Sequence, residues 1–221
     1  IQKAAYNALG NRKGSVIALN PKTGKIIAMV SKPDFNPNDN ELIKNWNVLV
    51  ESEDSPFVAR STSGLYAPGS TFKLLTALSA IRNGYENDTY VDEGKVEIGN
   101  SVFENHNNKS YGEIDLTRGF AVSSNVVFCT LGARIGGEKL RNIAEKFGFN
   151  KEFDFDIPYN ISRFPENIKD DEKEAALGMG QGDIQSTPLQ MALVTCGIAN
   201  GGKIMKPYLV DFVSDVNGEV I

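Results

Sequence analysis

Two residues one helical turn apart, Ser70 and Lys73, form the first group in the sequence that could carry out a reaction. Positions i and i+3 of a helix lie about 60° apart around its axis, so the hydroxyl and the amine share one face. A serine becomes a nucleophile when a base removes its proton, and a lysine can be that base if burial lowers its pKa toward neutrality. Because Pro68 and Gly69 precede the pair, Ser70 is predicted at a helix N-terminus, where free N–H groups can stabilise an oxyanion. Serine and lysine occur at this spacing by chance in many helices. Taken alone, the pair is therefore explained more simply by a structural role.

A second polar group, Ser123 and Asn125, lies between two predicted helices. On one continuous helix these side chains would point in nearly opposite directions, so they can reach one cleft only from a turn. From such a turn, a hydroxyl could pass on a proton and an amide could hold a substrate carbonyl. Taken alone, capping of the apolar helix that follows is the simpler explanation of the same residues.

The elements that must position these groups alternate between short strands and helices. Apolar runs at 15–19 and 25–30 flank a turn that contains Pro21 and Gly24, which predicts a β-hairpin. Apolar spacing and capping residues predict helices at 70–83, 115–122, 125–135, 138–147 and from 188 to the glycines at 201–202, with a shorter one near 41–50. Thr187 is expected to cap the last helix and Pro188 to occupy its first position.

The remaining segments are predicted to be less regular. Residues 1–14 read as the end of a preceding helix or a linker, and 85–114 as short strands and turns. Residues 154–176 are predicted to be irregular, with a solvated charged stretch at 170–174. A second hairpin is expected from 208–213 and from 219 onward, around a turn at 215–218.

Composition excludes some classes of function. The chain has 221 residues, of which 41% are hydrophobic and 23% charged, as in an ordinary globular protein. Its 23 Lys and Arg against 28 Asp and Glu give a net charge of −5, which argues against binding to nucleic acid. No apolar stretch approaches the roughly 18 residues that would span a bilayer. Without a starting Met or a signal peptide, the chain is expected to be part of a longer protein.

Metal and cofactor sites are not expected. Cys129, Cys196 and the single histidine, His106, are too few for a four-ligand zinc site. Both cysteines lie in apolar helical patterns and are predicted to be buried free thiols. The glycines at 178–182 lack the preceding strand and the spacing of a nucleotide-binding loop. His106 is predicted in a solvated loop, and Trp46 is predicted to serve packing.

Several segments, in this order along the chain, together resemble the transpeptidase domain of penicillin-binding proteins. The segments are Tyr66–Lys73, Ser123–Asn125, Gly178–Gly182, Ser186–Met191 and Ala199–Gly202, and Val16–Ser31 fits the first hairpin of that family. The resemblance covers nearly the whole chain and is nearest to the class B, penicillin-binding-protein-A-like branch. It implies an α+β fold of the serine β-lactamase and D,D-peptidase type, in which a helical cluster packs against an antiparallel sheet. Residues 1–221 would form the N-terminal and central part of one such domain.

The resemblance also implies a role for each candidate residue. Ser70 would attack the carbonyl of the penultimate D-alanine of a peptidoglycan stem peptide, and Lys73 would take the serine proton. Ser123 would pass a proton to the departing D-alanine, and Asn125 would hold the substrate backbone. The acyl-enzyme would then transfer to an amine of a neighbouring stem. β-Lactams, which mimic the D-Ala-D-Ala end, would acylate the same Ser70.

One feature of the family pattern is missing from these 221 residues. A Lys-Thr-Gly sequence is expected on a later strand, after the second hairpin, whereas the only one present is Lys22–Gly24. It precedes Ser70 and is predicted to form a hairpin turn. The later strands of the sheet are therefore expected to lie beyond Ile221, and the 221 residues alone are expected to have low activity.

Glu166 invites comparison with the deacylating glutamate of class A β-lactamases. The surrounding sequence departs from that loop motif, and the glutamate is predicted to have no such role. The acyl-enzyme would then be long-lived, which favours a transpeptidase that penicillin inhibits. A D,D-carboxypeptidase or β-lactamase remains an alternative, as does a β-lactam sensor or a non-catalytic cell-wall scaffold.

The resemblance further implies where the protein works and with what. Its expected ligands are D-Ala-D-Ala stem peptides and β-lactam antibiotics, and cell-division or elongation proteins are candidate partners. It is expected on the extracytoplasmic face of the bacterial membrane, anchored by an N-terminal segment outside these residues.

Overall fold

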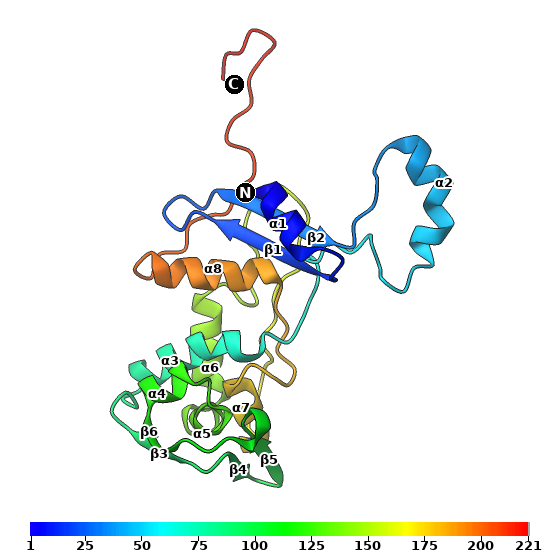
Figure 1. The fold of residues 1–221 in the computed structure, drawn as a ribbon. Coiled ribbons are helices and arrows are strands. Elements are labelled where there is room, and N and C mark those ends of the chain that lie inside the picture. The colour runs from blue at the N-terminus through cyan, green and yellow to red at the C-terminus, as the bar shows by residue number, and fades with distance from the viewer. Residues whose placement is uncertain (221) are drawn as a thin grey trace. The chain divides into compact units, whose positions relative to one another are not determined.

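The structure is a computed structural model that describes residues 1–220. It divides into two compact units (Figure 1). The first contains residues 1–65, 152–161 and those from 187 onward, and the second contains 66–151 and 162–186. All four candidate residues of the sequence analysis belong to the second unit. Among residues 1–220, no helix combines the length and the apolar character needed to cross a bilayer.

The first unit is built on the predicted hairpin. Strands β1 (Gly14–Leu19) and β2 (Ile26–Lys32) pair antiparallel, with Val16 opposite Val30. The buried positions of β2 alternate, as expected for a strand with one face on a core. Ile26 packs there against Leu189 and Leu193 of α8 (Pro188–Ala199). Helix α1 (Gln2–Leu9) precedes the hairpin.

The turn of this hairpin contains the Lys-Thr-Gly sequence at 22–24, as predicted. Gly24 has φ 84°, and a Cβ there would lie 2.0 Å from the carbonyl oxygen of Lys206. Glycine at this position thus permits both the turn and the close approach of the C-terminal segment. The sequence serves a structural purpose in this place.

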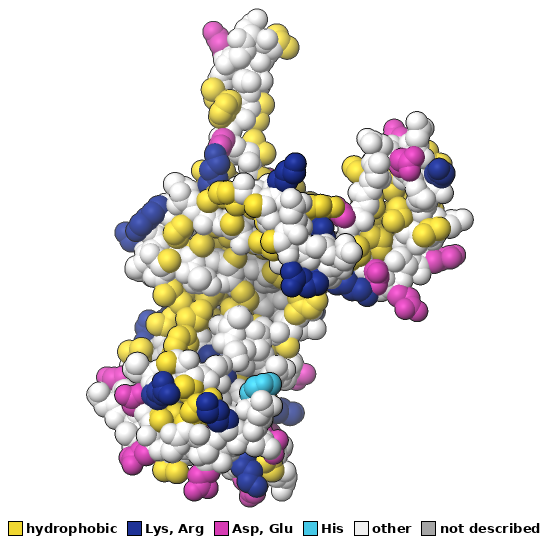
Figure 2. All heavy atoms as spheres, in the orientation of Figure 1, with side chains coloured by type: hydrophobic (Ala, Val, Ile, Leu, Met, Phe, Trp, Pro, Cys, Tyr) yellow, Lys and Arg dark blue, Asp and Glu magenta, His cyan; other side chains and the backbone are white. Residues whose placement is uncertain are grey.

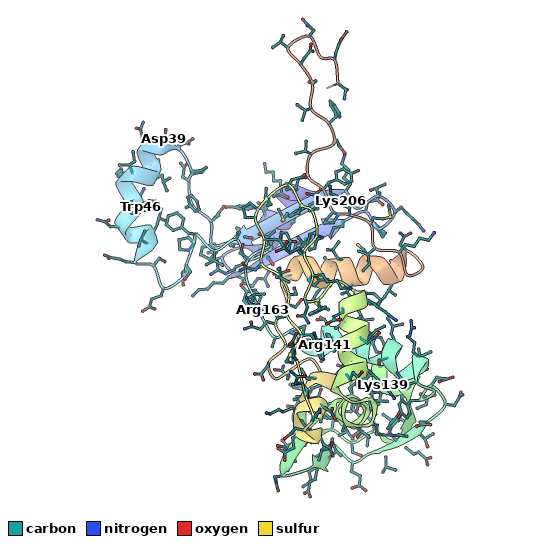
Figure 3. All side chains as sticks on the ribbon, turned by 180° about the vertical axis from the view of Figure 1, so that it is seen from behind. Asp39, Trp46, Lys139, Arg141, Arg163 and Lys206 are labelled. Atoms are coloured by element: carbon teal, nitrogen blue, oxygen red, sulfur yellow. The ribbon has the colours of Figure 1, made fainter. Side chains whose placement is uncertain are left out.

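Helices α2 and α8 also confirm predictions. The Thr187 hydroxyl accepts a hydrogen bond from the Gln190 N–H at 3.1 Å, and Pro188 opens α8. Helix α2 (Asp39–Val50; Figure 3) has no buried residue. Trp46 contacts the ring of Phe57 at 5.4 Å between centroids but is 51% exposed, so the prediction that it serves packing is only partly correct.

The second unit is a cluster of helices flanked by two small antiparallel sheets. The helices are α3 (Lys73–Arg82), α4 (Leu116–Ala121), α5 (Asn125–Ile135), α6 (Gly137–Lys146) and α7 (Asp171–Gly178). Strands β3 (Thr89–Asp92) and β6 (Gly112–Asp115) form one sheet, and β4 (Lys95–Ile98) and β5 (Ser101–Glu104) form the other. The predicted α+β class is confirmed, as are the strands and turns in 85–114.

Helix α5 forms the core of this unit. It is apolar around most of its circumference and largely buried, which suits a central helix. It packs closely on α7 at Gly132 and Gly178, where an added Cβ would approach the facing backbone to 2.3 Å. These two glycines allow the helix axes to come together. Cys129 of α5 is a buried free thiol, as predicted, whereas the free thiol of Cys196 on α8 is only partly buried.

The prediction that residues 154–176 are irregular, with a solvated stretch at 170–174, was wrong for the end of this segment. Residues 171–178 form α7, and the charged stretch begins it: the Asp170 carboxylate accepts from the Lys173 N–H, and Glu174 is buried. Acidic side chains stabilise the first turn of a helix, so a segment that reads as polar loop became a helix once one face met α5.

The second hairpin is reduced to its turn. The turn at 215–218 forms, with the Gly218 N–H donating to the Asp215 carbonyl at 3.1 Å. Within the described residues, 208–213 form no strand and only single bridges join Tyr208 to Lys25 and Ser214 to Val220. A strand requires a ladder of backbone partners, whereas here only Tyr208 forms a bridge and the N–H groups of Leu209 and Val210 donate to the Asp156 carboxylate.

Charged side chains of both signs are interspersed on the face drawn in Figure 2. The single histidine, His106, is exposed in a short 3₁₀ turn (His106–Asn108), as predicted for a solvated loop.

Candidate active site

The candidate nucleophile was predicted as the first residue of a helix and lies just before the observed α3. Ser70 is in a 3₁₀ turn, Gly69–Phe72, and α3 begins at Lys73. The turn is held on both sides of the serine: the Gly69 N–H donates to the carbonyl of Gly180 at 2.8 Å, and Phe72 is fully buried. The Phe72 ring lies 5.8 Å and 5.9 Å from the rings of Phe149 and Phe164. Ser70 itself is exposed, so the anchored turn presents its hydroxyl to solvent.

Lys73 is the most deeply buried cationic side chain of this site, at 1% exposure. Its Nζ donates to the Ser123 carbonyl at 2.8 Å, to Ser123 Oγ at 3.1 Å and to Asn125 Oδ1 at 2.7 Å. The Phe128 ring lies 5.5 Å from the same atom. Burial lowers the pKa of Lys73 from 10.5 to about 8, while the neighbouring Cys129 thiol opposes this shift. A lysine with such a pKa can act as a base near neutral pH.

Ser123 connects the nucleophile to the lysine. It lies between α4 and α5, and its φ of 56° places it in the left-handed region, which is uncommon for a residue with a side chain. From there its Oγ donates to Ser70 Oγ at 3.1 Å. The hydrogen-bonded path from Ser70 to Lys73 therefore passes through the Ser123 hydroxyl. When Lys73 is neutral, the same path in the reverse sense carries the Ser70 proton to its amine.

Asn125 is fixed at both ends of its amide group. Its Oδ1 accepts from Lys73, and its Nδ2 donates to the carbonyl of Glu104 at 2.7 Å. As the first residue of α5 it stands beside the Ser123 turn. The break between α4 and α5 thus brings Ser123 and Asn125 to one place, as the spacing required.

The structure brings together all four residues singled out in the sequence. Glu166, in contrast, is mostly exposed, and its Oε1 accepts from Arg141 Nη2 of α6 at 2.8 Å. This ion pair gives Glu166 a structural partner away from the four residues' hydrogen-bond path.

Sequence reasoning missed several residues that support the site. Gly180 was noted only as part of a family segment, although its positive φ and its contact with Gly69 hold the nucleophile turn. Asp92 and Asn105, both buried, hydrogen-bond around the Ser123–Asn125 turn. Nothing in the local pattern distinguishes these two from ordinary turn residues, because their partners are far away in the sequence.

Fold and site together define an α+β domain with a serine nucleophile, a buried lysine of lowered pKa and a hydroxyl between them. Such a set can form a covalent acyl-serine and pass its acyl group to an acceptor. Residues 14–220 match the family model of the penicillin binding protein transpeptidase domain. The chain belongs to the penicillin-binding protein transpeptidase family, and the resemblance stated from its motifs is confirmed.

Individual relatives agree with this assignment. The chain is 36% identical to the peptidoglycan D,D-transpeptidase PbpA of Mycolicibacterium smegmatis, over 96% of the chain and 46% of that protein. It is 39% identical, with a TM-score of 0.93, to the D,D-transpeptidase domain of a peptidoglycan glycosyltransferase from Eggerthella lenta, covering 100% of this chain and 57% of that one. Penicillin-binding protein A of M. tuberculosis, as its penicillin G acyl-enzyme complex, is 30% identical with a TM-score of 0.89, covering 99% of this chain and 54% of that one. The chain spans about half the length of the curated relatives it matches.

Proposed function

We propose that the protein is a serine D,D-transpeptidase of peptidoglycan synthesis that β-lactams inhibit by acylation. The observation that carries the proposal is the hydrogen-bonded path from Ser70 through Ser123 to a buried Lys73 whose pKa is about 8. The relatives add support, since one is named a D,D-transpeptidase and another forms an acyl-enzyme with penicillin G.

In the acylation step, Ser70 Oγ attacks the carbonyl carbon of the penultimate D-alanine of a stem peptide. Its proton moves to Ser123 as the Ser123 proton moves to neutral Lys73, so the hydroxyl is regenerated. When the tetrahedral intermediate collapses, the C–N bond breaks and the same path returns a proton to the departing D-alanine amine. The products are free D-alanine and an ester on Ser70.

In the transfer step, an amine of a second stem peptide attacks the ester carbonyl. Lys73, through Ser123, takes the proton of that amine, and Ser70 leaves with a proton as the new amide forms. Asn125 keeps Lys73 and Ser123 aligned in both steps, and we propose that the second N–H of its amide binds the substrate backbone.

A β-lactam follows only the first step. Its ring nitrogen is the leaving group but remains attached to the acyl group, so it occupies the place that an acceptor amine needs. Glu166, paired with Arg141, does not supply a deacylating base. The proposal therefore favours stable acylation over β-lactam hydrolysis.

The substrate also suggests where the protein acts. Because peptidoglycan stems are cross-linked outside the cytoplasm, we place the domain on the extracytoplasmic side of the bacterial membrane. A similar protein, PBP2 of Helicobacter pylori, forms a complex with MreC. We therefore propose morphogenetic proteins of cell elongation or division as partners.

Acylation should appear as a single mass increment. After incubation with penicillin G, intact-protein mass spectrometry is expected to show one added penicillin on most molecules, and Ser70→Ala is expected to abolish it. The control is Ser101→Ala, which removes a hydroxyl of the same unit that donates to Glu172 and lies outside the path. Continuous release of hydrolysed penicillin instead of a stoichiometric burst would identify a β-lactamase. Absence of any adduct on the unaltered protein would refute the proposal.

The pH dependence of acylation follows from Lys73. Because its pKa is about 8, the neutral fraction falls about tenfold for each pH unit below that value. The second-order rate constant for a fluorescent penicillin is expected to rise between pH 6 and 8 and to level off above about 8.5. An unshifted lysine would give a rise that continues beyond pH 10. A rate that does not change between pH 6 and 8 would show that Lys73 is not the base.

A further inference from the structure

A buried polar cluster lies directly behind the Ser123–Asn125 turn. It consists of Asp92, at the end of β3, Asn105, after β5, and Ser124, which caps α5. Their exposed fractions are 0%, 6% and 1%. Burying so many polar atoms is costly unless each is hydrogen-bonded, and here the bonds connect the three side chains to one another.

Asp92 is the centre of this cluster. Its carboxylate accepts from Asn105 Nδ2 at 2.7 Å and 2.9 Å, from Ser124 Oγ at 2.6 Å and from the Gly94 N–H at 2.9 Å. Among the described residues no cation forms a salt bridge with it. The carboxylate is therefore stabilised by neutral donors alone, and it dictates which way those donors point.

The direction matters most for Asn105. Because its Nδ2 is held by Asp92, its Oδ1 faces the start of α5 and accepts from the N–H groups of Asn125 at 2.7 Å and Val126 at 3.2 Å. A flipped amide would set two donors against these two N–H groups. The carbonyl of Lys109 also accepts from Asn105 Nδ2, at 2.8 Å, so Asp92 and this carbonyl together hold the amide in its orientation. Asn105 in turn fixes the backbone of Asn125.

Ser124 fixes the same turn from its other side. Its hydroxyl donates to Asp92 and accepts from the Val127 N–H at 3.0 Å, so it caps α5 and is anchored to the carboxylate. The neighbouring Ser123 is held at φ 56°, a conformation that persists only when its surroundings enforce it. A fully buried carboxylate without a cation thus stands directly behind the turn that carries Ser123 and Asn125.

We propose that Asp92 and Asn105 are positioning residues for the acyl-transfer reaction. They hold Ser123 and Asn125 within hydrogen-bond distance of Lys73 and Ser70. They act through the turn and do not touch the substrate. The inference rests on the proposed function, because the positions of the Ser123 and Asn125 side chains matter only if these residues take part in that chemistry.

Asp92→Asn tests the inference. An asparagine at 92 must set an N–H₂ group against Asn105 Nδ2 or against Ser124, so at least one of these two supports of the Ser123–Asn125 turn is weakened and Asn125 is displaced. The rate constant for acylation by a fluorescent penicillin is expected to fall by about tenfold or more, since small displacements of reacting groups are costly. Lys73 would also lose Asn125 Oδ1, an acceptor that favours its charged form, so the midpoint of the pH–rate profile is expected to move to lower pH.

The midpoint of the pH–rate profile distinguishes a positioning role of Asp92 from a simple loss of folded protein. The groups that face Lys73 are the Cys129 thiol and Phe128 ring of α5 together with Ser123 and Asn125, and Asp92→Asn leaves the first two in place. A smaller folded fraction lowers the amplitude of labelling but leaves the midpoint unchanged. A lower amplitude with the midpoint of the unaltered protein would therefore overturn the inference.

Two further variants complete the experiment. Glu174→Gln is the matched control, because Glu174 is also a buried carboxylate of this unit, and its Oε1 caps the Gly137 N–H at 2.7 Å. It is expected to leave rate and midpoint unchanged. Ser124→Ala removes one bond to Asp92 together with the cap on the Val127 N–H, and it provides the test if Asp92→Asn does not fold. The midpoint should again move to lower pH, and an unchanged midpoint overturns the inference. If the unaltered protein is not acylated at all, the proposed function fails.

Discussion

Replacing Lys73 by methionine is expected to reduce the rate of acylation by penicillin by about 10³-fold, which is the scale of a lost general base. Methionine retains most of the buried stem and removes the amine. Two effects on stability oppose each other: the Ser123 carbonyl and Asn125 Oδ1 lose a donor, and the cost of burying an ammonium disappears. We therefore expect the protein to stay folded. Rates of labelling by a fluorescent penicillin, with thermal unfolding followed in parallel, measure both effects.

The variant Lys73→Arg distinguishes the role of Lys73 as a base from its role as a buried cation. A guanidinium is a cation that can donate to Ser123 and Asn125 but does not lose a proton in this pH range. It is expected to be as inactive as the methionine variant. Lys146→Met is the control, since Lys146 is an exposed residue at the end of α6. If either Lys73 variant kept its rate within about tenfold of the unaltered protein, another base would be acting.

Gly180→Ala is expected to impair both stability and acylation. Gly180 has φ 80°, and a Cβ there would lie 2.1 Å from the Gly69 carbonyl oxygen and 2.8 Å from Phe72 Cβ. The backbone of the nucleophile turn must therefore move, and the Gly69–Gly180 hydrogen bond is weakened. We expect a loss of about 2–4 kcal/mol in unfolding free energy from the strained conformation and the lost bond. Displacement of Ser70 is expected to slow acylation by about 10²-fold.

Gly182→Ala provides the matched comparison. Gly182 has φ 78°, nearly the same conformation, but a Cβ there would meet only the Ala176 side chain at 3.7 Å. It is expected to cost only the conformational strain, about 1–2 kcal/mol, and to leave acylation unchanged. Denaturant unfolding and penicillin labelling of the two variants give the comparison. Equal labelling by both variants would show that Gly180 does not position Ser70.

The positions of the four site residues were predictable because they depend on residue spacing and helix ends within a few residues of each one. The i, i+3 spacing set Ser70 and Lys73 on one face, and the end of one apolar helix before Ser123 required a turn there. Capping residues predicted the start of α8, and the Pro-Gly turn predicted the hairpin that contains Lys22–Gly24. Each of these signals is carried by neighbours in the sequence.

The errors arose where a segment's structure depends on a distant partner. The charged stretch at 170–174 reads as solvated loop, yet it opens α7 because Ala175 and Leu177 are buried in the unit whose central helix is α5. Residues 208–213 are apolar enough for a strand, but within the described chain only Tyr208 forms a bridge, to Lys25. Burial and strand pairing are properties of the assembled chain, so local propensity does not decide them.

The sequence by itself determined the family, the four chemical groups and the turn that lets Ser123 and Asn125 share one place. Only the tertiary structure decided how the groups are connected: Ser70 reaches Lys73 through Ser123, and the pKa of Lys73 is lowered because the fold buries its amine. It also revealed the carboxylate of Asp92 behind the turn, 32 residues from its partner Ser124. Desolvation and long-range hydrogen bonds depend on the positions of atoms in space, which local spacing along the chain does not specify.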